Sequence, residues 1–321
     1  MSRLFTFGCS FTNYVWPTWA DIISQDYDYY ENWGENGAGN KHIHSSLVEC
    51  NQRNNITPND TVIIMWSSQA REDRFLNGKW FTQGSIYNST YPAEFVDNFT
   101  DLTGYLLDTV TYMQSSYDLL TQIGCNQHFF SMMPIDLDFK SNKWMSTVEK
   151  IVPAIFTKQS PVISKQILEL YAHVIQQVKP SVWETIFNGD WHSRDYHAIG
   201  NSKIQETEEL ERFAEQYNAV AGSSWPSFDD FINEKENKID ASVMKEIDEE
   251  FDFLTWRYFI KSGRIDHHPT PLEHLEYLDC VKFLVSDKAR SFAAHWENQL
   301  KTLQFEDKFV WENAVVKRFG V

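Results

Sequence analysis

The 321-residue sequence has no apolar run of about 18 residues, the length that a membrane-spanning helix requires. It is also poor in basic side chains, with 28 Lys and Arg against 45 Asp and Glu and a formal net charge of −17. Such an acidic chain repels phosphate backbones and anionic lipid surfaces. We therefore expect no membrane span, and neither nucleic acid nor a membrane among its partners.

Motifs that hold cofactors or metals are missing as well. The sequence has no complete Gly-x-Gly-x-x-Gly or Walker pattern, no His-Glu-x-x-His, and no Cys-x-x-Cys among its four cysteines. We therefore expect no cofactor and no structural zinc, and a reduced compartment. Residues 1–8 lead straight into an apolar segment instead of the layout of a secretory signal peptide, which predicts a cytoplasmic protein.

Short apolar segments alternate with helical patterns over the first 135 residues. Expected strands cover residues 4–7, 27–33, 61–65 and 127–133, and expected helices cover residues 17–23, 40–50 and 95–120. Alternation of this kind implies crossover connections and a parallel sheet with helices on both faces. We predict a three-layer α/β/α fold with a flavodoxin-like parallel sheet.

Beyond residue 134 the pattern changes to helices and loops. This change predicts a first part of the α/β core at 1–134, a mostly helical insertion at 135–262, and a final part of the core at 263–321. The final part is expected to hold one helix over residues 271–303. That helix would pack on the sheet through Leu275, Leu278, Val281, Leu284, Phe292 and Trp296.

A serine follows the first expected strand, in the segment Phe7-Gly8-Cys9-Ser10-Phe11-Thr12. Open α/β sheets place their sites at the carboxyl ends of the strands, so the Ser10 hydroxyl would be presented at the sheet edge. The alternative is a serine that only caps the following helix. Cys9 is a rival nucleophile, although a cysteine beside a buried strand is more often a small core residue.

Three further segments lie behind the next two strands and before the last helix. They are Trp33-Gly34-Glu35-Asn36-Gly37-Ala38-Gly39-Asn40, Met65-Trp66-Ser67-Ser68-Gln69-Ala70-Arg71, and Asp266-His267-His268-Pro269. In this order and at these places, and with Gly8-Cys9-Ser10 before them, they resemble the sequence blocks of the SGNH (GDSL-type) family of serine esterases. The start of the chain is also similar to SGNH-like proteins of tailed phages, which makes a virion location the alternative to the cytoplasm.

The resemblance implies a site with a serine nucleophile and an Asp–His pair. Ser10 would attack, His268 would act as the base, and Asp266 would orient it, with His267 and His274 in reserve as the base. Because Asp266 and His268 are two residues apart, an extended loop would point both side chains the same way. A separate segment, 190–197, contains His192 and His197, and for it we prefer the interpretation of a polar loop with exposed histidines.

Zinc binding is a further alternative for these residues. Its ligands would be Asp266, His268 and His274, with His192 or His197 from a second cluster. No recognised ligand spacing supports that set, so we expect a site without metal.

The resemblance also implies an oxyanion hole. Its donors would be the backbone N–H groups of Ser10 and Gly37, with Gly39 as the reserve glycine. A glycine is needed where the backbone must approach a substrate oxygen without an intervening side chain. The family has an asparagine after the third strand, whereas this sequence offers Ser68 or Gln69, of which we choose Ser68.

The implied activity is hydrolysis or transfer of acyl esters, with O-acetyl groups on carbohydrate as the expected substrate. Candidate substrate-binding residues are Arg71, Trp66, Trp80 and Tyr87. Ordinary loop packing is the alternative for the aromatic residues between the third strand and the long helix. The rival function is that of a non-catalytic structural or binding protein that retains the fold, such as a virion component. The expected partners are a small acyl-ester or carbohydrate substrate and, in addition, further copies of the chain in a homo-oligomer or the components of a virion.

Overall fold

A four-stranded parallel sheet forms the centre of the computed structural model, which describes residues 2–86, 91, 93–135, 160–188 and 268–302. The described residues up to position 297 belong to one compact unit. The strand order is β2-β1-β3-β6, and neighbouring strands are parallel. The strands are β1 (Arg3–Phe7), β2 (Tyr29–Asn32), β3 (Thr61–Trp66) and β6 (Asn126–Ser131). This order is that of the first four strands of a flavodoxin-like sheet, so the predicted sheet is confirmed.

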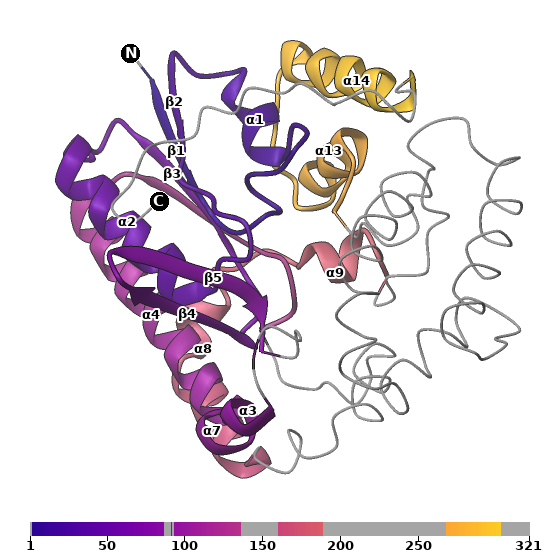
Figure 1. Cartoon of the computed structure of the whole chain (residues 1–321). Coiled ribbons are helices and arrows are strands. Elements are labelled where there is room, and N and C mark those ends of the chain that lie inside the picture. Colours follow the sequence, from indigo (N-terminus) through magenta and orange to yellow (C-terminus); the bar gives the residue numbers. More distant parts are fainter. Residues whose placement is uncertain (1, 87–90, 92, 136–159, 189–267, 303–321) are drawn as a thin grey trace, which may run out of the picture. The chain divides into compact units, whose positions relative to one another are not determined.

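Helices cover both faces of this sheet (Figure 1). Helices α2 (Asn40–Asn54) and α4 (Leu102–Ile123) lie on one face, and α1 (Trp19–Ser24) and α13 (Pro271–Cys280) lie on the other. Neighbouring side chains of β6 point to opposite layers, because Phe129 contacts Tyr117 of α4 whereas Phe130 contacts Trp19 of α1. The predicted three-layer α/β/α fold is confirmed.

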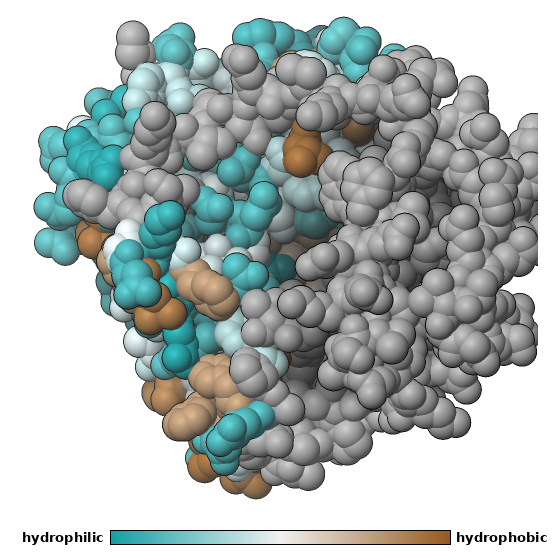
Figure 2. Space-filling model, viewed as in Figure 1, coloured by the Kyte–Doolittle hydropathy of each residue, from teal (hydrophilic) through white to brown (hydrophobic). Residues whose placement is uncertain are grey.

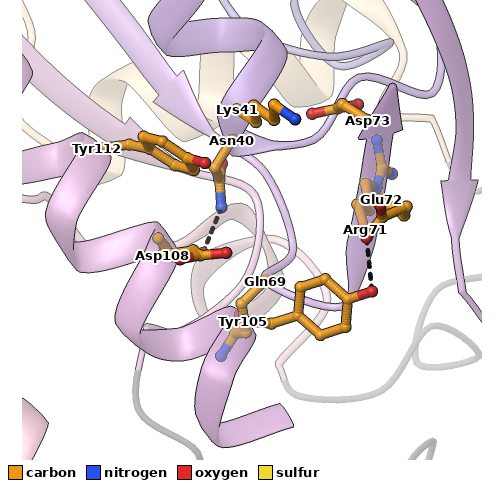
Figure 3. A pocket seen from close by; sticks show the side chains of 10 residues that line it. Asn40, Lys41, Gln69, Arg71, Glu72, Asp73, Tyr105, Asp108 and Tyr112 are labelled. Atoms are coloured by element: carbon orange, nitrogen blue, oxygen red, sulfur yellow. Dashed lines mark hydrogen bonds between the residues drawn. The ribbon is translucent and has the colours of Figure 1, made fainter. Parts of the chain in front are cut away.

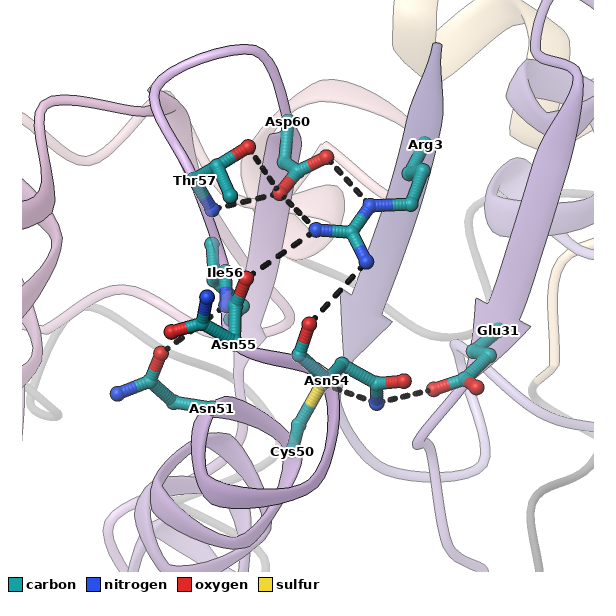
Figure 4. A network of polar contacts seen from close by, with 9 residues as sticks. All are labelled: Arg3, Glu31, Cys50, Asn51, Asn54, Asn55, Ile56, Thr57 and Asp60. Carbon is teal, nitrogen blue, oxygen red and sulfur yellow. Dashed lines mark hydrogen bonds and ion pairs between the residues drawn. The ribbon is translucent and has the colours of Figure 1, made fainter. Parts of the chain in front are cut away.

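The amino-terminal ends of β1 and β3 are joined by a network of polar contacts (Figure 4). The Arg3 guanidinium donates to both carboxylate oxygens of Asp60, at 2.7 and 2.5 Å. It also donates to the carbonyl oxygens of Asn54 and Asn55, where α2 ends. One arginine therefore links two strands to the carbonyl end of a helix, where a positive charge is favourable.

An antiparallel hairpin, which sequence analysis did not predict, follows β3. Its strands are β4 (Arg71–Leu76) and β5 (Lys79–Ser85). The turn residues Asn77 and Gly78 have φ angles of 52° and 80°, as the tight two-residue turn of a hairpin requires. Trp80 and Phe81 therefore lie in a strand rather than in a loop.

Two long helices of the sequence prediction are each divided in the structure. The expected helix at 95–120 is α3 (Ala93–Phe99) followed by α4, because the Asp101 side chain accepts from the N–H groups of the first turn of α4. The expected helix at 271–303 is α13 followed by α14 (Asp287–Thr302). Lys282 has a left-handed φ of 56° just after α13, where the helix ends. Leu284 is 91% exposed, so the predicted packing of Leu284 on the sheet is wrong.

The described part of the predicted insertion packs against the sheet domain. Helix α7 (Pro161–Leu170) is capped by the side chain of Ser160 and contacts α4, as does the short helix α8 (Ala172–Ile175). Val178 then forms a parallel bridge with Phe129 of β6, and α9 (Val182–Thr185) follows. The remainder of the predicted insertion, with its carboxyl-terminal boundary, lies outside the described residues and stays a prediction.

The surface of the described residues is mostly hydrophilic on the face shown in Figure 2, with smaller apolar patches between the polar side chains. Phe75 and Leu76, next to the hairpin turn, are about half exposed. Among the described residues, no helix combines the length and the apolar character that crossing a membrane needs.

A buried carboxylate at the start of α1 gives the first prediction. Asp21 accepts from the Thr18 N–H at 2.9 Å and from the Tyr30 hydroxyl at 3.2 Å, and burial raises the pKa of Asp21 from 3.8 to about 6. The folded protein therefore holds this proton more tightly than the unfolded chain, so the contribution of Asp21 to stability falls as pH rises from about 4 to 6. We expect Asp21→Asn to become more stable relative to the wild type over this interval, by up to about 3 kcal/mol.

Urea unfolding of both proteins at pH 4, 5, 6 and 7 measures this difference. A difference that stays constant over the whole series contradicts the prediction.

Candidate active site

The loop after β1 makes a tight turn that carries Ser10. The N–H groups of Thr12 and Asn13 both donate to the Cys9 carbonyl oxygen, at 2.8 and 3.1 Å. Gly8 must be small, because a Cβ there would lie 1.9 Å from Thr12 Oγ1. The sequence therefore holds Ser10 just beyond the carboxyl end of β1, where sites of open parallel sheets lie.

Ser10 carries unpaired polar groups, and the buried Thr12 Oγ1 of the same loop also has no partner within the described residues. Within the described part of the chain, neither the hydroxyl nor the N–H of Ser10 forms a hydrogen bond, and the residue retains 8% of its surface. Buried polar groups in proteins are nearly always paired, so unpaired groups at the surface of a loop are available to a ligand.

The amide of Asn32 joins the loops after β1 and β2. Its Nδ2 donates to the Thr12 carbonyl oxygen at 2.8 Å, and its Oδ1 accepts from the Gly34 N–H at 2.9 Å. Asn13 Nδ2 adds a bond to the Gly34 carbonyl oxygen at 3.1 Å. Asn32 is fully buried, and sequence analysis did not single it out.

Gly37 lies in the second loop with a positive φ of 71°. A Cβ at this position would be 2.2 Å from the Thr82 carbonyl oxygen of β5, so no larger residue fits. Among the described residues the Gly37 N–H has no hydrogen-bond partner, whereas the N–H of the reserve candidate Gly39 donates to Asp73 at 2.8 Å. Gly37 is therefore the better oxyanion donor of the two.

The third loop follows β3 and is anchored by Asn40. The Ser67 N–H donates to Asn40 Oδ1 at 2.8 Å, and Asn40 Nδ2 donates back to the Ser67 carbonyl oxygen at 3.2 Å. Ser68 is half-buried, and its Oγ accepts from the Ala70 N–H at 3.2 Å, which leaves its own proton to donate. Gln69 is buried and its amide donates to the Ile135 carbonyl oxygen.

The structure brings His268 onto the loop that carries Ser10. The His268 ring stacks on Tyr14, with centroids 3.7 Å apart, and meets the Phe11 ring edge-on at 5.2 Å. Trp16 Nε1 donates to the Pro269 carbonyl oxygen at 2.9 Å and so fixes the next residue. No hydrogen bond joins Ser10 to His268 within the described residues. Asp266 and His267 lie outside them, so their predicted roles stay predictions.

The reserve base His274 and the rival nucleophile Cys9 are both buried. Burial, with a smaller effect of the nearby His268 charge, lowers the pKa of His274 to about 3, so that its ring is a weak base. The Cys9 thiol is fully buried and lies 3.7 Å from Met132 Sδ, which suits a core residue better than a nucleophile.

The candidate substrate-binding residues differ in position. Trp66 is fully buried in β3, where its ring stacks on Phe129, so the predicted substrate contact is wrong for this residue. Trp80 is half-buried in β5, with its ring edge-on to His42 at 4.9 Å. Tyr87 lies outside the described residues.

Arg71 lines a cavity of about 100 Å³ between α2, α4 and β4 (Figure 3). Its polar lining includes Lys41, Arg71, Glu72, Tyr105, Asp108 and Tyr112. The Tyr105 hydroxyl donates to Glu72 at 2.6 Å, and Arg71 donates to the Ala38 carbonyl oxygen at 2.9 Å, next to Gly37. Positively charged, negatively charged and hydroxyl-bearing side chains therefore all line this small cavity beside the second loop.

Metal ligation has no support in the described part of the chain, where no group of three or more His, Cys, Asp or Glu side chains has the arrangement to hold a metal ion. Asp266, His192 and His197 of the zinc alternative are not among those residues, so that alternative stays open.

No family model matches the sequence, and no curated protein matches it. Solved structures that align with it include a member of the lipolytic protein G-D-S-L family from Veillonella parvula DSM 2008 and a candidate acylhydrolase from Bacteroides fragilis NCTC 9343. The first is 14% identical, with a TM-score of 0.32, over 61% of this chain and 86% of its own. The second is 12% identical, with a TM-score of 0.28, over 79% of this chain and 87% of its own.

The first of these proteins belongs by its description to the GDSL group that the sequence segments resemble. The α/β/α fold is the one that the resemblance implies. Structural similarity this low assigns no role to any residue, so the candidate site is argued from its own geometry alone.

The link between the first two loops gives the second prediction. Replacing Asn32 by Ala removes its bonds to the Thr12 carbonyl oxygen and the Gly34 N–H, so we expect a loss of about 1–3 kcal/mol in the free energy of unfolding. Hydrogen exchange at the Gly34 amide should also become faster. Asn36→Ala, an exposed asparagine of the same loop, is the matched control and should leave both quantities unchanged. Equal stability of the two variants argues against the link.

Proposed function

We propose that this protein is an SGNH-type serine esterase that acts on small acyl esters. The observation that supports it most is a set of three unpaired polar groups: within the described residues, the Ser10 hydroxyl, the Ser10 N–H and the Gly37 N–H have no partner. The carbonyl groups of Asn36 and Gly37 beside them are hydrogen bonded to β5. A nucleophile and two oxyanion donors are what acyl transfer needs at one place.

In the proposed mechanism Ser10 Oγ bonds to the acyl carbon while His268 takes the hydroxyl proton and Asp266 orients the imidazole. The carbonyl oxygen becomes an oxyanion, which accepts from the N–H groups of Ser10 and Gly37 and from the Ser68 hydroxyl. His268 returns the proton to the alcohol as the ester bond breaks. Water then releases the acid from Ser10 by the same steps. Closure of Ser10 onto His268 would accompany substrate binding, since such contacts are often loose in a free enzyme.

The proposed substrate class is an O-acetylated carbohydrate. The cavity beside Gly37 presents carboxylates, hydroxyls and two basic groups, a mixture that suits neutral hydroxyl groups better than an ion of either sign. Arg71 connects the cavity to the second loop through the Ala38 carbonyl oxygen. An acetyl group near Ser10 and a sugar hydroxyl in the cavity would then be bound together.

A non-catalytic binding protein with the same fold is the second candidate. Two observations favour it: Ser68 stands where the family has an asparagine, and no hydrogen bond joins the described residues Ser10 and His268. Retained binding without Ser10-dependent turnover would distinguish this candidate from the esterase.

Removal of the nucleophile tests the esterase proposal. We expect Ser10→Ala to lower kcat/KM for p-nitrophenyl acetate by a factor on the order of 10³ or more, and to abolish labelling by a fluorophosphonate. Cys9→Ala is the matched control for the rival nucleophile and should keep both. Equal rates for the wild type and Ser10→Ala would remove the catalytic claim.

The same assay with a chelator separates serine from zinc chemistry. We expect activity to be unaffected. Activity that disappears with the chelator and returns with zinc would favour the metal alternative.

Asp108 tests the proposed carbohydrate preference. It lines the cavity from α4, and we expect Asp108→Asn to raise KM for an O-acetylated sugar by about three- to tenfold, the value of one hydrogen bond. KM for p-nitrophenyl acetate, which has no sugar hydroxyl, should not change. Asp118→Asn, an exposed position farther along α4, is the control. An equal effect on both substrates would contradict a sugar contact at Asp108.

A further inference from the structure

The second loop is held by the β4–β5 hairpin through its carbonyl groups. Thr82 Oγ1 donates to the Asn36 carbonyl oxygen at 3.0 Å, and the Gly84 N–H donates to the Gly37 carbonyl oxygen at 3.0 Å. Arg71 Nη1 donates to the Ala38 carbonyl oxygen at 2.9 Å. Three successive carbonyls of one loop thus face the same hairpin.

The N–H groups on the carboxyl-terminal side of Gly37 in the same loop are also bound. The Ala38 N–H donates to the Glu35 carbonyl oxygen at 3.1 Å, and the Gly39 N–H donates to Asp73 at 2.8 Å. Among the described residues, the N–H groups of Asn36 and Gly37 have no partner, and of these two residues Gly37 has no side chain to intervene.

Asp73 anchors the hairpin at the far end of the loop. Gly39 is the N-cap of α2 and has no side chain to cap it, so the first N–H groups of this helix need an outside acceptor. The carboxylate of Asp73 is 3% exposed and accepts from the Gly39 N–H and, at 2.9 Å, from the His42 N–H. Residue 73 of the hairpin therefore serves as the cap that α2 lacks.

Peptide planarity then fixes the direction of the Gly37 N–H. The Asn36 carbonyl and the Gly37 N–H belong to one planar trans peptide group, in which they point in opposite directions. Because Thr82 binds the carbonyl on the hairpin side, the N–H points away from the hairpin. A single side-chain hydroxyl therefore orients the peptide that carries this donor.

We propose that Thr82 is a positioning residue of the oxyanion hole, acting through the Asn36–Gly37 peptide. The inference rests on the proposed esterase function, because it assigns the Gly37 N–H to the oxyanion. Thr82 touches no reacting atom. The hairpin thus serves the candidate site as a support that orients one backbone donor.

Thr82→Val removes the hydroxyl and keeps the shape of the side chain. Loss of a whole oxyanion donor costs about 10²–10³ in rate, and a donor that is present but less well oriented should cost less, so we expect kcat for p-nitrophenyl acetate to fall about tenfold. KM should stay near the wild-type value, since the donor acts mainly in the transition state. Thr82→Ser restores the hydroxyl and should restore kcat.

Thr111→Val is the matched control. Its hydroxyl also donates to a backbone carbonyl, that of Leu107 at 2.7 Å, but on the exposed face of α4. This variant should keep the wild-type kcat. A Thr82→Val enzyme with unchanged kcat, in a series where Ser10→Ala is inactive, overturns the inference and leaves the esterase proposal intact.

A measurement without substrate tests Thr82 by itself. In ¹⁵N–¹H spectra of the whole chain, the Gly37 amide resonance should shift in Thr82→Val and return in Thr82→Ser, while Thr111→Val leaves it in place. An unchanged Gly37 resonance in Thr82→Val shows that the hydroxyl does not orient this peptide, whether or not the protein turns over an ester. Failure of Ser10-dependent turnover with a shifted Gly37 resonance instead removes the esterase proposal and keeps the geometric one.

Discussion

The buried amide of Asn32 holds together the two loops on which the candidate site is built. A carboxamide can donate and accept at once, and Asn32 uses both functions to bridge a carbonyl of the first loop and an N–H of the second. Asn40 does the same for the third loop, at the N–H and carbonyl of Ser67. Each of these buried hydrogen bonds contributes to stability, and without the two amides the loops after three neighbouring strands would lose them.

A consequence is that hydrogen-bonded backbone groups and unpaired polar groups lie within a few residues of each other in these loops. Around Ser10 and Gly37 the backbone is held by loop-to-loop bonds and by the hairpin, so the unpaired groups are held in fixed directions. Preorganised donors of this kind cost no reorganisation when charge develops on a bound ligand. The hydrogen bonds around the site are therefore as much a part of it as the reacting groups, because they fix the directions of those groups.

The sheet could be predicted because its strands are short apolar runs bounded by turns. Strands β1 and β3 are buried almost throughout, so both of their faces had to be apolar, and the helices between the strands follow from that alternation. The positions of Ser10 and of the glycine loop follow from the strand ends. The contact of His268 with the Ser10 loop could not follow from spacing alone, because 258 residues separate the two in the sequence.

The features that sequence analysis missed depend on local turns or on distant partners. The hairpin had a signal, Asn77-Gly78, but its strands are mostly polar and so lack a clear alternation. Apolar spacing continues across the break at Asp101, so periodicity could not divide α3 from α4. Trp66 looked accessible because it follows the expected strand, yet β3 extends through it and its side chain is fully buried.

The segment from Val178 to Trp183 has a consequence for the open edge of the sheet. β6, like β2, is an edge strand of the sheet in the described residues, and its carbonyl groups would otherwise offer a template for pairing with a strand of another chain. The Lys179 N–H instead donates to the Phe129 carbonyl oxygen at 2.9 Å, and the Trp183 N–H donates to that of Met132 at 3.1 Å. A segment that bridges β6 at one residue and then turns into α9 thus covers this edge without offering an edge of its own, which protects the folded chain against edge-to-edge aggregation.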